Sequence, residues 1–326
     1  MKHIIILATE GSNLGSIDNP RRAFLTVNEY CKNIGKVPMF NVQIAGNSKE
    51  VKLANGIYTI HPDIEIKNIK KSGLVIIPAF EGDIKTGVEQ NINLIPWIIQ
   101  QYKKGSEIAS LCVGAFLLAA TGLLDGKNCS THWRASNEFR NMFPNVNLVT
   151  DKILTDENGI YTSGGAFSSA NLILYIIEKY AGREAAIHCS KTFQVDIDRH
   201  SQSPFIIFEG QKNHQDEHIK KAQEIIEKNV REKISVDQIA TMLSIGRRNL
   251  ERRFRKATSN SLTEYMQRVK VEAAKQRFET SADNVNEVMY NVGYSDPKAF
   301  RTTFKRFTGL SPVSYRNKYN RELAVV

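Results

Sequence analysis

The chain has 326 residues, more than one ordinary hydrophobic core accommodates, which predicts two domains. Apolar residues make up 41% of it and charged residues 24%, so we expect both domains to be globular rather than disordered. No apolar run approaches the roughly 20 residues of a membrane-spanning helix. The apolar start ends at Thr9 and Glu10, before it reaches the length of a signal-peptide core. We therefore expect a cytoplasmic protein with no membrane partner.

The positive charge is concentrated towards the C-terminus. The net charge is +10, and residues 1–215 contain 22 Lys and Arg against 20 Asp and Glu, whereas residues 216–326 contain 22 against 14. This asymmetry is typical of a chain with one domain that binds nucleic acid, although a basic excess can also serve solubility alone. The four cysteines form no C-x-x-C pair, so we expect a reduced chain without metal or cofactor.

Short apolar runs alternate with helical patterns over residues 1–196. The buried strands predicted from these runs are His3–Ala8, Met39–Ala45, Leu74–Pro78 and Glu107–Leu111. The helices predicted between and after them lie near Pro20–Asn33, Asn91–Lys104, Val113–Thr121, Arg134–Phe143 and Ser168–Tyr180. Residues Lys152–Ser163 predict a hairpin. Strand–helix alternation predicts an α/β domain with a parallel sheet, of flavodoxin-like or amidotransferase-like type.

Residues 197–215 lose all periodicity, and we interpret them as a linker. Residues 216–320 show only helical patterns, and residues 321–326 are a predicted tail. The predicted helices are Glu217–Asn229, Val236–Leu243, Arg247–Thr258, Thr263–Glu279, Val285–Val292 and Asp296–Thr308. Capping boxes are predicted at Ser235, Ser261 and Asn284, each followed three residues later by Gln or Glu. Gly309 and Pro312 are predicted to end the last long helix.

One pattern occurs twice in this helical domain. Apolar residues recur at matching places, namely Ala240, Leu250 and Phe254 in the first copy and Met289, Phe300 and Phe304 in the second. Each copy has a short helix, a tight turn that holds Gly246 or Gly293, and a longer helix. This order is typical of a helix-turn-helix unit, whose second helix enters a major groove of DNA.

The longer helix of each copy has a polar face opposite its apolar one. In the first copy this face carries Arg248, Glu251, Arg252 and Arg255, and in the second it carries Lys298, Arg301, Thr302 and Lys305. A basic helix face can simply be solvated, but its repetition in two helix-turn-helix units favours DNA as the partner.

Residues 217–320 resemble the AraC-type DNA-binding domain, most clearly in Val292–Phe300 and Phe304–Pro312. The resemblance implies two units that read successive major grooves of promoter DNA, joined by the Thr263–Glu279 helix. It places the base-reading positions on Arg248, Glu251 and Arg252 in the first unit and on Lys298, Ala299 and Thr302 in the second. Thr302 stands where the family often has arginine, which implies weaker base reading by the second unit. The full set of predicted DNA-binding residues is Arg247, Arg248, Glu251, Arg252, Arg255, Lys298, Ala299, Arg301, Thr302 and Lys305.

Cys112 follows the predicted strand Glu107–Leu111 directly and precedes a predicted helix. A thiol in such an elbow is expected to have a lowered pKa, because of the helix dipole and the free backbone N–H groups. His132 follows twenty residues later, and a Cys–His pair is able to perform nucleophilic chemistry. From spacing alone, a buried small cysteine and a packed histidine is the favoured interpretation of these two residues.

The stretches Cys112–Gly126 and Thr131–Trp133 resemble the PfpI-like, class I glutamine amidotransferase-like fold, in the version that precedes AraC-type domains. Two departures from the enzymes of that fold weaken a catalytic interpretation. Arg22 stands where a glutamate would be expected, and Ala79 stands where the oxyanion loop usually begins with glycine. We therefore interpret Cys112 and His132 as vestigial or sensing residues. The predicted ligand pocket, placed at the carboxyl ends of the strands, comprises Asp18, Arg22, Ala79, Cys112, Val113 and His132, with Arg22 suited to an anion.

Three functions compete. The favoured one is a transcription activator that is not an enzyme, forms a homodimer, binds a small-molecule effector in residues 1–196 and binds promoter DNA with residues 216–320, with RNA polymerase as a further possible partner. The second is a cysteine hydrolase or amidase with a DNA-binding appendage. The third is a constitutive DNA-binding protein whose α/β domain only dimerises.

Overall fold

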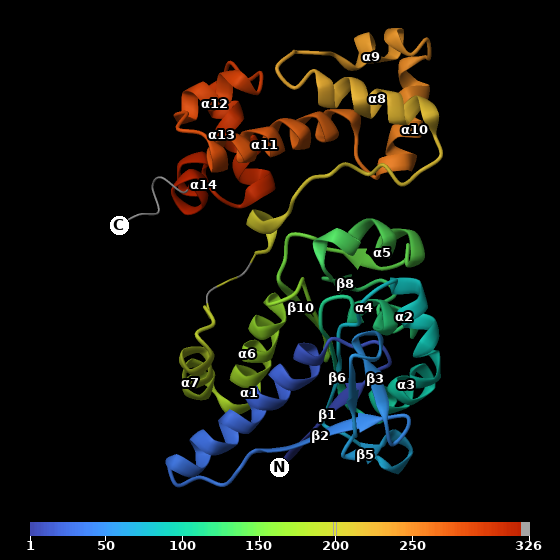
Figure 1. Cartoon of the computed structure of the whole chain (residues 1–326), viewed down its shortest axis with the longest axis vertical. Helices are drawn as coiled ribbons and strands as arrows, with labels where there is room; N and C mark the ends of the chain where they lie inside the picture. Colours follow the sequence, from blue (N-terminus) through green and yellow to red (C-terminus); the bar gives the residue numbers. More distant parts are fainter. Residues whose placement is uncertain (198, 200, 321–326) are drawn as a thin grey trace. The chain divides into compact units, whose positions relative to one another are not determined.

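The computed structural model describes residues 1–197, 199 and 201–320 (Figure 1). Two positions of the predicted linker, 198 and 200, and the predicted tail 321–326 lie outside the described residues. The chain divides into two compact units, one up to Gln202 and one from Ser203 onward. Within the described residues, no helix combines the length and the apolar character needed to cross a bilayer.

The first unit is built on a seven-stranded sheet. Its strands, in spatial order, are β10 (Leu154–Glu157), β11 (Ile160–Ser163), β7 (Glu107–Ser110), β6 (Leu74–Ile77), β1 (Lys2–Ala8), β2 (Phe40–Gly46) and β5 (Ile64–Glu65). Every neighbouring pair is parallel except β10 and β11, which form the predicted antiparallel hairpin. The predicted α/β class with a parallel sheet is confirmed.

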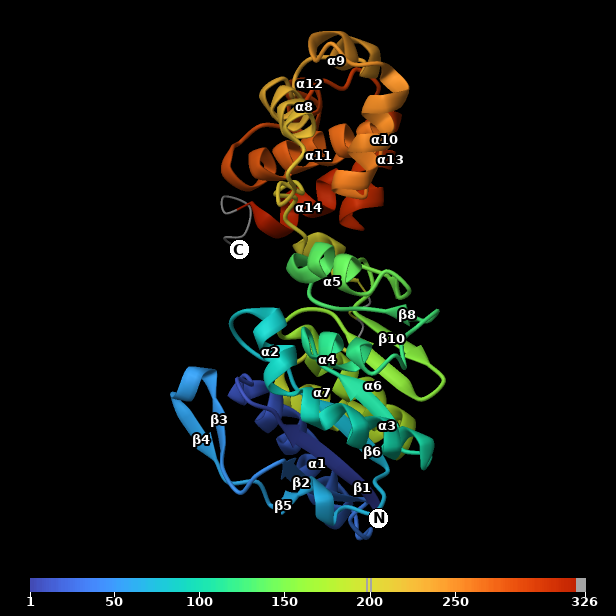
Figure 2. The same ribbon diagram turned by 90° about the vertical axis from the view of Figure 1, so that its right-hand side faces the viewer.

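Helices cover both faces of this sheet (Figures 1 and 2). One face carries α1 (Leu14–Asn33), α6 (Ser168–Ala181) and α7 (Arg183–Phe193), and the other carries α2 (Ile84–Gln90), α3 (Ile95–Lys103), α4 (Gly114–Ala120) and α5 (Ser136–Met142). Two small ribbons, β3–β4 (Val51–Leu53 and Tyr58–Ile60) and β8–β9 (Asn128–Cys129 and Asn147–Leu148), lie outside the main sheet.

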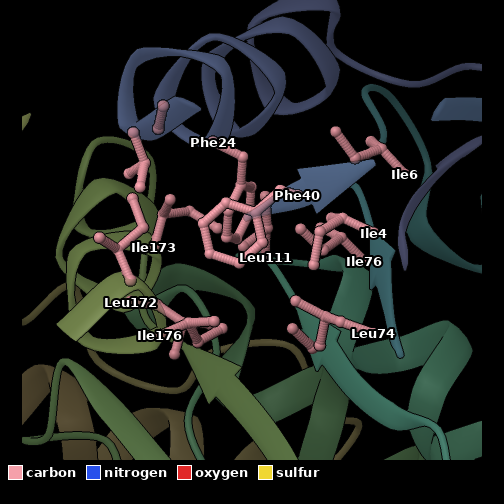
Figure 3. Packing of buried hydrophobic residues seen from close by; sticks show 14 of the residues in the cluster. Ile4, Ile6, Phe24, Phe40, Leu74, Ile76, Leu111, Leu172, Ile173 and Ile176 are labelled. Carbon is pink, nitrogen blue, oxygen red and sulfur yellow. The ribbon is translucent and has the colours of Figure 1, made fainter. Parts of the chain in front are cut away.

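The central strands supply both hydrophobic cores because successive side chains of a strand point to opposite faces. Ile4 and Ile6 of β1 pack under α1 and α6 together with Leu74 and Ile76 of β6, as Figure 3 shows. The intervening residues of both strands belong to the core under α3 and α4. A strand that is buried on both faces reads as a continuous apolar run, which is why β1 and β6 were predictable.

Some elements differ from the prediction. Helix α1 begins at Leu14, six residues before the predicted start at Pro20, so the proline lies inside the helix rather than in its first turn. Helices α2 and α7 and strands β3 to β5 were not predicted. The buried residues of α7 are the small side chains Ala185, Ala186 and Cys189, which produce only a weak apolar period.

The second unit contains seven α-helices among its described residues. They are α8 (Glu217–Lys228), α9 (Val236–Met242), α10 (Arg247–Thr258), α11 (Leu262–Thr280), α12 (Val285–Asn291), α13 (Pro297–Thr308) and α14 (Pro312–Tyr319). All six predicted helices are confirmed, and α14 was not predicted. The unit has two hydrophobic cores, one under α8 to α10 and one under α12 to α14, and α11 contributes side chains to both (Figure 1).

The helix starts follow the predicted caps in two of three cases. Ser235 and Asn284 form complete capping boxes with Gln238 and Glu287. The box predicted at Ser261 is wrong, although Ser261 still accepts a hydrogen bond from the backbone N–H of Glu264. The Glu264 carboxylate accepts instead from Arg268 one turn later, at 2.9 Å, and this ion pair replaces the return bond of the box.

The segment 197–215 is divided between the two units. The Gln202 side chain is buried in the first unit. In the second unit, the backbone carbonyl of Ile206 accepts a hydrogen bond from Lys275 Nζ at 2.6 Å, and the Phe208 ring packs against Tyr265 with 5.1 Å between ring centroids. Residues 203–208 therefore pack on the helical unit instead of crossing open solvent.

Candidate nucleic-acid interface and ligand cavity

The helical unit is an internal duplication with a spacing of 50 residues. Leu250 and Phe254 of α10 are buried at the same helical positions as Phe300 and Phe304 of α13. At the last residue of each helix, a buried threonine hydroxyl donates to the carbonyl four residues earlier, from Thr258 at 2.8 Å and from the matching Thr308 at 2.9 Å.

The duplication extends into the helices that follow α10 and α13. Buried Tyr265 near the start of α11 donates its hydroxyl proton to Glu227 at 2.7 Å. Buried Tyr315 of α14, fifty residues later, donates to Glu279 in the same way. Helix α14 is thus the counterpart of the first turns of α11. The sequence signal that could have predicted it is the repeated spacing of Ser, Tyr and Thr in both copies.

The turns of the two helix-turn-helix units differ in the residue that adopts the left-handed conformation. In the first turn it is Ser244, with a φ of 54°, and Gly246 is instead the N-cap of α10 with a φ of −65°. In the second turn it is Gly293, with a φ of 76°. Each predicted turn therefore holds its glycine, but only Gly293 adopts the left-handed conformation, and Ser244 takes that part in the first turn.

All ten predicted DNA-binding residues lie on exposed positions of α10 and α13. On α10, Arg247 is held in ion pairs with Asp237 at 2.9 Å and with Glu251 at 3.1 Å. Arg252 donates a hydrogen bond to the Asn249 side chain at 3.0 Å. Arg248 and Arg255 have no side-chain partner within the part of the chain that the structure describes, so they present unpaired positive charge on this face.

The exposed face of α13 is less basic at its start. Asp296 caps the helix by accepting from the backbone N–H of Lys298 at 2.9 Å. Lys298, Arg301 and Lys305 supply positive charge, whereas Ala299 and Thr302 supply none. Both long helices therefore combine a buried apolar face with an exposed polar one, but α10 carries the denser arginine cluster.

The α/β unit contains a cavity of about 660 Å³ at the carboxyl ends of the strands. It lies among the start of α1, the loops after β6 and β7, and the start of α6. The polar side chains that line it include Asn13, Ser16, Asn19 and Glu81, and the aromatic ones are Phe80, Phe167 and Phe193. Among the described lining residues, Glu81 is the only one with a charged side chain.

The structure brings Ala79, Cys112 and Val113 of the predicted pocket together at this cavity. Asp18, Arg22 and His132 are not among the residues that line it. Asp18 is paired with Arg21 at 3.1 Å, and the Arg22 guanidinium lies 5.8 Å from the centre of the Phe193 ring. His132 lies against Gly165, where an added Cβ would come within 2.4 Å of the imidazole ring.

Cys112 occupies the expected elbow, with a φ of 53° that is unusual for a residue other than glycine. The expectation of a lowered thiol pKa is wrong. Cys112 is buried, and burial raises the pKa of its thiol more than the hydrogen bonds from the Ala166 and Val113 backbone lower it. Among the described residues, no hydrogen bond joins this thiol to His132, whose own pKa is lowered by burial and then by the nearby Arg134.

Close backbone approaches shape the elbow. A Cβ at Gly114 would lie 2.5 Å from the carbonyl oxygen of Pro78, so only glycine lets α4 start against the end of β6. The loop after β6 is tied to α1, since Ala79 O accepts from Asn13 N at 2.9 Å and from Ser16 Oγ at 3.1 Å. These contacts hold Ala79 at the cavity wall, where sequence reasoning expected an oxyanion loop.

Comparisons with known proteins agree with this two-part architecture. The sequence profile of the DJ-1/PfpI family matches residues 33–179, and that of a helix-turn-helix domain matches residues 239–318. The HTH-type transcriptional regulator GbdR of Pseudomonas aeruginosa is 26% identical over 277 residues, which cover 82% of this chain and 71% of GbdR. The HTH-type transcriptional regulator ArgR of the same species is 25% identical over 220 residues, or 67% of each chain.

A solved structure shows the same fold for the first unit. The crystal structure of a putative transcriptional regulator protein from Vibrio parahaemolyticus has a TM-score of 0.52 and 22% identity, covering 59% of this chain and 98% of that one.

The chain thus combines a DJ-1/PfpI-type α/β domain with an AraC-type helix-turn-helix domain. GbdR and ArgR, to which the chain is similar along most of its length, are transcriptional regulators. The protein is accordingly a DNA-binding transcriptional regulator of the helix-turn-helix type.

Proposed function

We propose that the protein activates transcription by placing α10 and α13 in successive major grooves of promoter DNA. The observation that carries this proposal is the recurrence, at a spacing of 50 residues, of an exposed basic helix face over a buried apolar one. DNA binding also supports a cytoplasmic location. Arg248, Glu251 and Arg252 are proposed to read bases in the first groove, and Lys298, Ala299 and Thr302 in the second.

Binding of the full chain to DNA selected from a random pool tests this proposal. The double variant Arg248→Ala/Arg252→Ala should lose most of its preference for the selected sequence over random DNA. A charge-matched control, Lys221→Ala/Lys228→Ala, removes two exposed lysines from α8 and should keep that preference. Equal loss of preference in both double variants would show that α10 does not read bases.

We further propose that the α/β domain binds a small organic effector in the cavity of about 660 Å³, a volume typical of ligand sites. Glu81 and the three aromatic rings favour a molecule without net negative charge, in place of the anion expected from Arg22. A thermal-shift screen of small amines, amides and carboxylates tests this, because a ligand that binds the native state raises the melting temperature. Stabilisation by carboxylates alone would contradict the proposed charge preference.

The loop 164–167 offers a route from this cavity to the DNA-binding unit. Phe167 lines the cavity, and the Gly165 N–H donates to the Gln202 side chain at 3.4 Å. A Cβ at Gly164 would lie 2.6 Å from Gln202 Oε1, so the loop and this side chain are in close contact. A shift of the loop is therefore expected to move Gln202, the last residue of the α/β unit. Gln202→Ala should keep the thermal shift given by a ligand but abolish that ligand's effect on DNA affinity. A retained effect would rule out this route.

The α/β domain is also proposed to hold two chains together as a homodimer and to leave the DNA-bound protein free to contact RNA polymerase. Sedimentation of the full chain tests the first point, and a monomer at all concentrations would contradict it.

We propose that the protein is not an enzyme. The raised pKa of Cys112 and the position of His132 away from the cavity both disfavour nucleophilic chemistry. The competing function, a cysteine hydrolase or amidase, requires turnover of an amide, ester or aldehyde that disappears in Cys112→Ala. No turnover is expected from wild type.

A further inference from the structure

The two helix-turn-helix units touch each other directly beside α11. The loop between α8 and α9 belongs to the first helix-turn-helix unit. It meets the turn between α12 and α13, which belongs to the second helix-turn-helix unit. Val230 in the first loop packs against the hydrophobic cores of both units. Lys233 in the same loop donates a hydrogen bond to the Ser295 hydroxyl in the second turn at 3.0 Å.

Lys270, in the middle of α11, joins the two loops. Its Nζ donates to the carbonyl of Val230 at 2.6 Å and to that of Glu232 at 3.2 Å, both in the first unit. It also donates to the carbonyl of Val292, in the second unit, at 3.0 Å. An ammonium group has three hydrogens, and here each has a backbone acceptor. One side chain therefore connects three chain segments.

The second turn is shaped to fit this contact. A Cβ at Gly293 would lie 2.4 Å from the carbonyl oxygen of Arg231 and 2.5 Å from Lys270 Nζ, so a larger residue would push the loops apart. The matching residue of the first turn is Ser244, which has a similar left-handed backbone but is exposed. The glycine at the second turn is thus required by the approach of the first unit as well as by its own φ.

Part of the space between the two units is open. A cavity of about 380 Å³ lies beside the contact, lined by Thr263, Met266 and Gln267 of α11 and by Ala299 of α13. Close packing therefore does not lock the units together across this space. Their relative orientation depends on α11, on the contacts around Lys270, and on two side chains of α13 that meet the first half of α11. Arg306 donates to the Gln267 side chain at 2.7 Å, and the Arg268 guanidinium lies 4.7 Å from the centre of the Phe307 ring.

We propose that Lys270 is a positioning residue that fixes the relative orientation of α10 and α13 and so sets the spacing of the two DNA half-sites. This inference rests on the proposed function, since it requires that both helices enter DNA. B-DNA completes a turn in about 10–10.5 base pairs, so one added base pair rotates a half-site by roughly 35°. Two rigidly held recognition helices cannot follow that rotation, whereas loosely held ones can.

The test compares two lysines on α11 in the full-length protein. Lys270→Met keeps most of the side-chain length but removes the three donors. Lys275→Met is the matched control, because the buried Lys275 ammonium also binds a carbonyl, that of Ile206 at 2.6 Å, which lies in neither the α8–α9 loop nor the α12–α13 turn. Each protein is titrated with the DNA site selected by wild type, and with the same site carrying one inserted or one deleted base pair between its half-sites.

Wild type and Lys275→Met should bind the altered spacings at least tenfold more weakly than the selected site. Lys270→Met should show a penalty below threefold. If Lys270→Met weakens binding to all spacings by the same factor, the proposal is overturned. The lysine would then only provide hydrogen bonds to the carbonyls of Val230, Glu232 and Val292, without setting the spacing of the half-sites. If wild type selects no sequence at all, the proposed function fails first and this inference falls with it.

A second pair of variants keeps the test decisive where Lys270→Met does not fold. Gly293→Ala places a methyl group against the Arg231 carbonyl, and Ser244→Ala places one at the matching exposed position of the first turn. Ser244 already has a Cβ in a left-handed conformation, so this variant controls for a changed side chain in a turn, whereas Gly293→Ala adds both backbone strain and the clash with the other unit. The spacing penalty should fall in Gly293→Ala alone, and an unchanged penalty there would overturn the proposal.

Discussion

The first and second helix-turn-helix units have nearly the same interior and different surfaces. Phe254 and Phe304 fill the same place in the two cores, and Tyr265 and Tyr315 make the same hydrogen bond to a glutamate. On the exposed faces, Arg252 of α10 corresponds to Thr302 of α13. Packing is therefore the same in the two copies, whereas the charge on the exposed face of the second helix differs. The two units should therefore be equal in stability and unequal in base reading.

Substitutions in the two hydrophobic cores should change the free energy of unfolding more than any other substitution considered below. Phe254→Ala and Phe304→Ala should each lower the free energy of unfolding by about 3–5 kcal/mol, because each leaves a cavity under a long helix. Chemical denaturation of the full chain, followed by the loss of helical signal, measures this. Met242→Ala on α9 is the control, since that side chain is 61% exposed and its removal should cost less than about 0.5 kcal/mol. A loss of unfolding free energy in only one of the two variants would show that the two cores are not equally stable.

The next effect concerns base reading. Arg252→Ala should lose roughly 1–3 kcal/mol of discrimination at one or two base pairs, because arginine can bind guanine through two hydrogen bonds. Thr302→Ala should lose clearly less at its own position. Competition between the selected site and single-base variants of it measures both. The inequality of the two units would be refuted by a greater loss in Thr302→Ala.

A smaller effect concerns phosphate contacts. Lys305→Ala should weaken binding to all sequences about equally and reduce the slope of log affinity against log salt concentration by roughly 1, because one counterion-releasing contact is lost. Titrations at several salt concentrations measure the slope. A sequence-dependent loss in Lys305→Ala would instead assign this lysine to base reading.

The smallest effect is a pH dependence that only the first unit should show. The Arg253 guanidinium holds the pKa of Asp216 below its usual range, and the position that corresponds to Arg253 in the second unit is Thr303. Because the folded pKa is lowered, this stabilisation is complete above the unfolded pKa of about 3.9 and is lost as pH falls through the folded value. Acid unfolding of wild type and of Asp216→Asn, which keeps a capping side chain, should show a gap in stability at neutral pH that narrows below pH 4. A stability difference between the two proteins that stays constant with pH would contradict the lowered pKa of Asp216.

The duplicated interior could be predicted from sequence to a large extent. Apolar residues at helical spacing around Leu250 and Phe300, and the caps at Ser235 and Asn284, depend on local periodicity and local hydrogen bonds. Helix α14 was not predicted because its signal is not a local period. The signal is the repetition of Thr258, Ser261 and Tyr265 fifty residues later, which appears only when the two copies are aligned beyond α10 and α13.

The contacts between distant segments could not be predicted. The three acceptors of Lys270 are backbone carbonyls, which carry no sequence signal, and the close approach at Gly293 depends on a loop 62 residues earlier. The cavity of the α/β domain lies at the strand ends, as predicted, but the side chains of Asp18 and Arg22 do not line it. Which face of α1 meets the cavity depends on where that helix starts, and the true start at Leu14 was missed. Burial of Cys112, which reverses the expected direction of its pKa shift, likewise depends on the packing of loop 164–167.

We propose that α10 and α13 both enter DNA but contribute unequally to sequence recognition. The most direct measurement is a complete single-base substitution scan of the site selected by the full chain, with affinity determined for every variant. We expect two clusters of sensitive positions about one helical turn apart, with costs of roughly 1–3 kcal/mol per base pair in one cluster and smaller costs in the other. A single cluster, or two clusters of equal cost, would contradict the account.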